Sequence, residues 1–94
     1  MKSEIERLIH ETIDEINEQT PPDRRIAKSS QAVIVGMGST LDSLGIINFL
    51  VSLEAKVATS MGRTVSLLSD DTLSDPNGPL HTVESIERFI AEQI

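Results

Sequence analysis

The stretch that most constrains the fold of this chain begins at Asp42-Ser43 and stays strongly apolar to at least Val57. It is long enough for a helix, and it lacks the alternation of apolar and polar residues that marks a half-exposed strand. A helix this apolar has to be packed against other elements. Because a chain of 94 residues has room for one modest core, we expect a single domain spanning residues 1–94.

Two amphipathic segments, one toward each end of the chain, are the expected packing partners of this central helix. The segment from Ser3 to about Gln19 carries apolar residues at helical spacing, namely Ile5, Leu8, Ile9, Ile13 and Ile16. The last segment has Thr82 as its N-cap, with Val83, Ile86, Phe89, Ile90 and Ile94 on one face. We therefore predict an all-α fold, a small antiparallel bundle of three main helices plus a short third helix.

The connections between these helices are long. The apolar run from Ala32 to Val35 could be a strand, an irregular stretch under the core, or a helical turn. The region from Gly62 to His81 is rich in turn-forming residues, and we expect the short third helix to be a turn near 70–74. Loops should make up most of the chain outside the three main helices.

The central helix has more apolar surface than one core-facing stripe requires. With about 100° between successive residues, one arc holds the expected core residues Ile46, Phe49, Leu50, Leu53 and Val57. Leu44, Ile47 and Val51 lie beside this arc, and they are either the edge of a wide core stripe or a docking patch. They extend along the helix from the end that carries Ser43, so a partner that reaches Ser43 would also contact them.

Ser43 lies at the predicted start of the central helix. Unpaired backbone N–H groups and the positive end of the helix dipole make this position favourable for a phosphate group. The simpler interpretation is that Asp42 or Ser43 is an N-cap residue with no further role. Residue type and position alone leave both interpretations open.

The segment Leu41-Asp42-Ser43-Leu44 and its continuation to Glu54 resemble the acyl carrier protein family. In that family the phosphopantetheine serine lies in an Asp-Ser-Leu motif that opens the second helix. The surrounding pattern is also similar, with an acidic first helix, a long loop, the motif near mid-chain, and Thr82-Val83 opening a last helix. The resemblance covers about residues 3 to 94.

The resemblance implies a function for several residues. Ser43 would carry 4'-phosphopantetheine, transferred from coenzyme A by a phosphopantetheinyl transferase, and Asp42 would be the neighbouring acid that helps this enzyme and its magnesium engage the motif. Leu44, Ile47, Val51 and Glu54 match positions that carrier proteins present to partner enzymes. The thiol of the arm would hold acyl intermediates as thioesters for acyl-loading and acyl-processing enzymes, so the protein itself would not be an enzyme.

Departures from the family pattern point to a specialised, free-standing carrier. Asn48 and Ala55 occupy positions where fatty-acid-synthesis carriers commonly have acids, and Lys56 follows directly. The stretch from Ala58 to His81 is longer than the usual link to the last helix. A fatty-acid, polyketide or related pathway is expected, and an aminoacyl cargo is an open variant. The alternative is an interaction module that is never loaded and uses the same apolar patch to dock other helices.

Composition limits the partners and the compartment. The net charge of −7 argues against nucleic acid as a partner and favours partner enzymes with basic docking surfaces. The chain has two aromatic residues, too few to stack on nucleic acid bases. No run of about 18 apolar residues is present, so we expect no membrane insertion. An acidic N-terminal segment without a secretory pattern and the absence of cysteine suggest a cytoplasmic protein, expected to be a monomer. His10 and His81 lack a third ligand at metal spacing, so no metal site is expected.

Overall fold

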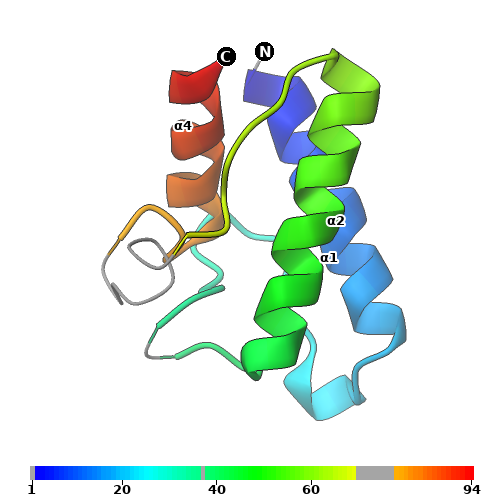
Figure 1. Cartoon of the computed structure of the whole chain (residues 1–94). Coiled ribbons are helices and arrows are strands. Elements are labelled where there is room, and N and C mark those ends of the chain that lie inside the picture. Colours follow the sequence, from blue (N-terminus) through cyan, green and yellow to red (C-terminus); the bar gives the residue numbers. More distant parts are fainter. Residues whose placement is uncertain (1, 37, 70–77) are drawn as a thin grey trace.

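The computed structural model describes residues 2–36, 38–69 and 78–94 of the chain. Within them lie three α-helices, α1 (Lys2–Glu18), α2 (Ser43–Met61) and α4 (Val83–Gln93), and the 3-10 turn η1 (Pro22–Arg24). The described residues contain no strand, and the helices pack into one compact globule (Figure 1). The predicted all-α class and its three main helices are therefore confirmed.

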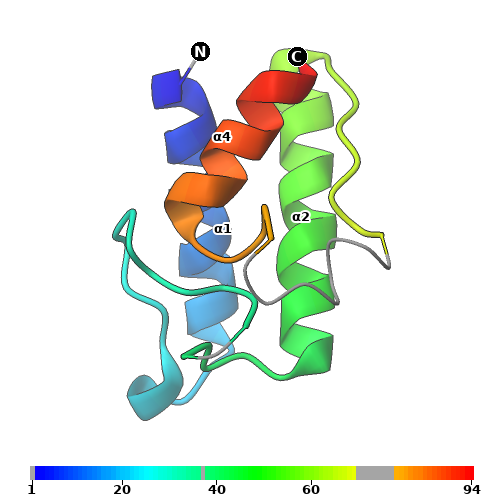
Figure 2. The same ribbon diagram turned by 90° about the vertical axis from the view of Figure 1, so that its left-hand side faces the viewer.

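The long helix α1 is the element that the other two share. Its backbone packs closely against those of both α2 and α4, whereas the backbones of α2 and α4 come close to each other at few points. As Figures 1 and 2 show, α1 runs antiparallel to α2 and to α4, and α4 crosses the other two obliquely. The start of α1 and the end of α4 lie at one end of the bundle, and α2 begins at the opposite end.

The core is built from the faces that the helical spacing predicts. Its fully or almost fully buried helix residues are Ile5, Leu8, Ile9 and Ile13 of α1, Phe49, Leu50, Leu53 and Val57 of α2, and Val83, Ile86 and Ile90 of α4. Ile16, Ile46, Phe89 and Ile94 are partly buried against them. Loop residues complete the core, namely Ile26, Ile34, Val35, Val65, Leu67 and Leu80. Apolar burial from the loops explains how so short a chain covers three helices.

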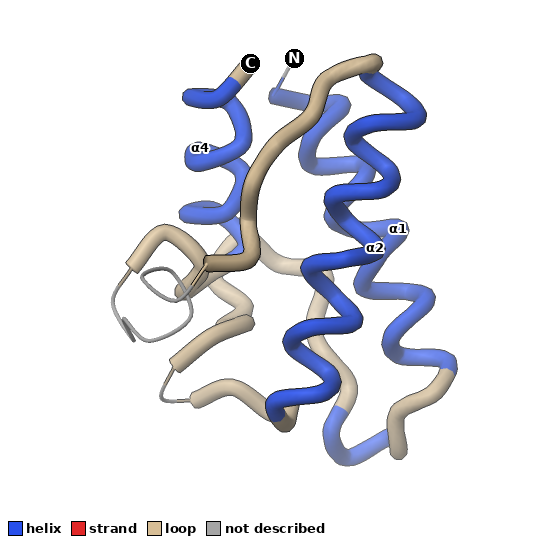
Figure 3. The backbone as a smooth tube through the Cα atoms, in the orientation of Figure 1, coloured by secondary structure: helices blue, strands red, loops and turns tan. Residues whose placement is uncertain are grey.

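The apolar run from Ala32 to Val35 is an irregular stretch under the core, the second of the three alternatives left open by the sequence. It forms a single isolated bridge, between Val33 and Thr82. The N–H of Val83, in the first turn of α4, donates to the Ala32 carbonyl at 3.0 Å. This long loop, tan in Figure 3, therefore satisfies a helix N–H that has no partner within the helix.

The segment of residues 63–69, here called the strap, runs back from the end of α2 along the side of the α2–α4 pair that faces away from α1 (Figures 1 and 2). Val65 and Leu67 are buried and the intervening Ser66 is exposed, as expected of an extended chain with one face inward. The strap is not helical. The short third helix predicted near 70–74 lies outside the described residues.

By length and composition alone, α2 is apolar enough to cross a membrane, with a mean hydropathy of 1.3 over an 18-residue window. The sequence contains no uninterrupted run of about 18 apolar residues. A mean hydropathy over such a window can still be high when a few polar residues are scattered along the helix, as they are in α2. The core helix of a globular protein meets the same criterion. Four side chains of α2 are buried in the core formed with α1 and α4, as expected if α2 is the core helix of a globular protein.

Candidate functional site

The N-terminus of α2 is capped by Asp42, which leaves Ser43 available. Asp42 has extended backbone angles, and its Oδ1 accepts a hydrogen bond from the Gly45 N–H at 2.7 Å. Ser43 is the first residue of the helix, and it is exposed. Asp42 thus caps the helix, and the hydroxyl of Ser43 is not needed for capping.

Gly45 contributes to this arrangement in a way that sequence reasoning missed. A Cβ at this position would lie 3.2 Å from Asp42 Oδ1 and 3.3 Å from Leu41 Cδ2, both tighter than ordinary contacts. The absence of a side chain therefore lets the Asp42 carboxylate sit over the first turn. The available signal in the sequence was a glycine three residues after the capping aspartate.

The apolar patch, defined as Leu44, Ile47 and Val51, lies on the surface of α2. The three residues are 67%, 42% and 49% exposed, respectively, and they are the large apolar residues that the described part of the chain leaves exposed. The interpretation of a wide core stripe is therefore wrong, since the core is complete without them. The patch follows directly from Ser43 along the helix, as the spacing predicts.

Glu54, the fourth expected partner-contact residue, is engaged with the strap. Its Oε2 accepts hydrogen bonds from the N–H groups of Leu67 at 2.7 Å and Leu68 at 3.2 Å. From the other side, the Gln93 side chain of α4 pairs with both the N–H and the carbonyl of Ser66, at 2.9 and 3.2 Å. The strap is thus tied to both α2 and α4.

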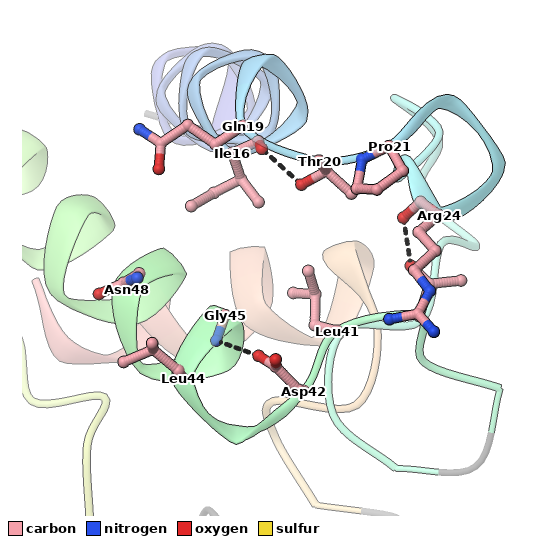
Figure 4. A pocket seen from close by; sticks show the side chains of 11 residues that line it. Ile16, Gln19, Thr20, Pro21, Arg24, Leu41, Asp42, Leu44, Gly45 and Asn48 are labelled. Carbon is pink, nitrogen blue, oxygen red and sulfur yellow. Dashed lines mark hydrogen bonds between the residues drawn. The ribbon is translucent and has the colours of Figure 1, made fainter.

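A shallow hollow of about 200 Å³ opens beside the start of α2 (Figure 4). Its lining comes from the last turn of α1 and the residues after it, from η1, from the loop before α2 and from the first turns of α2. The lining residues are Ile16, Gln19, Thr20, Pro21, Arg24, Thr40, Leu41, Asp42, Leu44, Gly45 and Asn48. Asp42 and Leu44, the two neighbours of Ser43 in sequence, are both part of this lining. Sequence reasoning missed the hollow, because loop residues far from Ser43 in sequence form one side of it.

Charges around α2 are partly neutralised by ion pairs. Lys56, one of the departures from the carrier pattern, pairs with Glu15 of α1. Arg25 donates from Nε to the carbonyls of Asn17, in the last turn of α1, and of Thr20, which follows the helix. Arg24 differs, because its guanidinium makes no hydrogen bond or ion pair with the part of the chain that the structure describes. It lies at the edge of the hollow, where Figure 4 shows it beside the loop that carries Leu41.

The histidines take no part in this site. The Nδ1 atom of His81 lies 2.9 Å from the Val35 carbonyl oxygen, a contact that helps to fix the loop before α4. In residues 2–36, 38–69 and 78–94, no three His, Asp or Glu side chains are grouped closely enough to hold a metal ion.

Comparisons with known proteins identify no relative of this chain. No protein-family model, no curated protein and no solved structure matches the chain. The functional argument therefore depends on the geometry at the start of α2.

Proposed function

We propose that this chain is an acyl carrier protein whose Ser43 bears 4'-phosphopantetheine. One observation supports this proposal above the others. An exposed serine at the first position of α2 stands next to an apolar patch, Leu44, Ile47 and Val51, that runs up the same helix and is not needed for the core. An enzyme that docks on the patch would have the serine directly within reach.

The loading reaction is a phosphoryl transfer. The Ser43 Oγ attacks the phosphorus of coenzyme A that bears the pantetheine, and the bond from that phosphorus to the 3',5'-ADP oxygen breaks. A phosphodiester forms on Ser43, 3',5'-ADP leaves, and the serine proton passes to a base of the transferase. The transferase supplies the magnesium that offsets the charge of the pyrophosphate.

The residues next to Ser43 fit this reaction. The free N–H groups in the first turn of α2 and the positive end of its dipole favour the phosphodiester that is formed. The Asp42 carboxylate is exposed while its Oδ1 caps the helix, so the transferase and its magnesium can approach the acid without unfolding the turn. Asp42 therefore assists installation of the arm, whereas Ser43 carries it.

The loaded protein would present acyl intermediates, held as thioesters on the thiol of the arm, and would perform no chemistry of its own. Its partners are the phosphopantetheinyl transferase and the acyl-loading and acyl-processing enzymes, with apolar contacts to the patch and basic side chains around it. The net charge of −7 supports basic partner surfaces and opposes nucleic acid. Glu54 takes part in docking through Oε1, the oxygen that the strap does not use.

We assign this carrier to a specialised fatty-acid, polyketide or related pathway, acting as a cytoplasmic monomer without membrane insertion. The reason for a specialised pathway is the weak acidity of α2, whose one carboxylate is Glu54. Asn48 and Ala55 are exposed, and Lys56 is paired with Glu15. This helix offers a partner less negative charge and more apolar surface than a strongly acidic helix does. A partner enzyme adapted to a strongly acidic helix would therefore fit it less well.

The test is intact-mass measurement after incubation with coenzyme A, magnesium and a broad-specificity phosphopantetheinyl transferase. The wild-type chain should gain one phosphopantetheine and Ser43→Ala should gain none. Ser60→Ala, which removes another exposed serine of α2, is the matched control and should load fully. Loading of Ser43→Ala, or no loading of the wild-type chain by several transferases, would contradict the proposal.

Asp42→Asn separates the two functions of that residue. Asparagine caps a helix about as well as aspartate, so the folded state should keep its stability within about 0.5 kcal/mol. Loading should nevertheless slow at least about tenfold, an activation cost of roughly 1.4 kcal/mol, because the carboxylate is lost. Unchanged loading kinetics in Asp42→Asn would mean that Asp42 is a cap residue only.

The exposed patch also favours a second candidate function, an interaction module that docks a partner helix and is never loaded. This function requires the patch but not the Ser43 hydroxyl. Ile47→Asp should then abolish partner binding while Ser43→Ala leaves it intact. Covalent loading of the wild-type chain excludes this candidate as the principal function.

A further inference from the structure

The hollow beside Ser43 has a size and a position that suit part of a flexible chain. Its volume of about 200 Å³ is smaller than the roughly 300 Å³ of pockets that enclose whole small molecules. A segment tethered at Ser43 needs no enclosing pocket, because the tether itself raises its local concentration, to the millimolar range for short flexible links. Asp42 and Leu44 line the hollow on either side of the attachment point in sequence.

The lining offers the groups that a pantetheine chain would use. Pantetheine contains amides, a hydroxyl and a geminal dimethyl group. The amide side chains of Gln19 and Asn48 line the hollow on the α1 and α2 sides (Figure 4), where they can pair with amides of the arm. Ile16, Leu41 and Leu44 supply apolar surface for the methyl groups.

Arg24 supplies a positive charge that the fold does not otherwise use. Its backbone is fixed, since its N–H donates to the Pro21 carbonyl at 2.9 Å and its carbonyl accepts from Thr40 Oγ1 at 2.8 Å. Its guanidinium has no partner in the described part of the chain. Guanidinium groups suit phosphate, because their donors match its oxygens in pairs.

Resting on the proposed function, we propose that the phosphopantetheine arm of Ser43 folds back into this hollow when no partner is bound. The phosphodiester lies between the start of α2 and Arg24, and the dimethyl group contacts Ile16, Leu41 and Leu44. The arm then rests on the α1 side of α2, away from the strap. Leu44 belongs both to the hollow and to the patch, so the arm covers part of the patch while it lies in the hollow.

The test compares ¹⁵N–¹H spectra of the unloaded and fully loaded protein, with loading verified by intact mass. Loading changes the amides close to Ser43 in any case, so the reporters are Gln19, Thr20 and Arg24, which are distant in sequence but line the hollow. Their signals should shift on loading, and those of strap residues Ser66 and Leu68 should not.

Arg24→Gln should load to completion yet lose most of the shifts at Gln19 and Thr20. Arg63→Gln is the matched control, because Arg63 is an exposed arginine beyond the far end of α2, and this variant should keep the shifts. Loading with changes confined to residues near Ser43, or centred on the strap, overturns this inference alone. Absence of loading overturns the proposed function and this inference with it.

Discussion

Replacing Glu54 with Ala removes the carboxylate oxygen that two N–H groups of the strap share. Hydrogen bonds to charged groups contribute about 1.5–3 kcal/mol each, and those at this partly buried site share a single acceptor. We therefore expect Glu54→Ala to lower the free energy of unfolding by about 2–3 kcal/mol. For a domain of this size that corresponds to a fall of roughly 10–20 °C in Tm.

Glu54→Gln is the more informative variant, since it changes the charge and keeps a carbonyl oxygen. The amide oxygen can accept from the same N–H groups, as a neutral acceptor of about half the strength. The expected loss is about 1 kcal/mol. Glu92→Ala serves as the control, because Glu92 is exposed on α4, and its removal should change the stability by less than about 0.5 kcal/mol.

The assay is urea and thermal denaturation of the three variants, with hydrogen exchange at Leu68 as a local readout. Exchange at this amide should accelerate in Glu54→Ala more than in Glu54→Gln, and it should be unchanged in Glu92→Ala. If Glu54→Ala unfolds with wild-type stability and wild-type exchange at Leu68, then the carboxylate does not hold the strap and the reasoning is refuted.

Three further substitutions test the helices themselves by denaturation. Phe49→Ala empties a fully buried position of the core and should cost about 3–5 kcal/mol; a cost near 1 kcal/mol would show that the core can collapse around the missing ring. Gly62→Ala should cost about 1 kcal/mol through backbone strain alone, because Gly62 ends α2 at a φ of +65° with open space around it, and an unchanged Tm would contradict this. Thr82→Ala should cost about 1 kcal/mol by removing the N-cap acceptor from the Ser85 N–H, with Ser85→Ala expected to show part of the same loss.

The helices were predictable because their apolar spacing and their caps are local features of the sequence. The first helix was expected over Ser3 to about Gln19 and is Lys2–Glu18, and Thr82 caps the last helix as expected. The apolar patch was predictable as a candidate for the same reason, since a wheel places Ile47 beside the core arc. The exposure of the patch was not predictable, because it depends on which part of α2 the other helices cover.

The strap and the hollow depend on contacts between residues far apart in sequence, which no local pattern encodes. Glu54 contacts the strap 13 residues further on at Leu67. Sequence reasoning placed Glu54 at the surface as a partner contact, since its spacing along α2 gives no sign of the backbone N–H groups it meets. Arg24 could not be assigned to the site from the sequence, because its place in the hollow beside Asp42 and Leu44 depends on how the loop after α1 folds.

The placement of the chain ends has a practical consequence. The start of α1 and the end of α4 lie together at one end of the bundle, and α2, whose first residue is Ser43, begins at the other (Figures 1 and 2). An affinity tag, a fluorophore or a solid support attached at either end would therefore point away from the modified serine. The protein can be immobilised through its terminus on a sensor surface with Ser43 directed into solution, which allows the docking rates of candidate enzymes to be measured before and after loading.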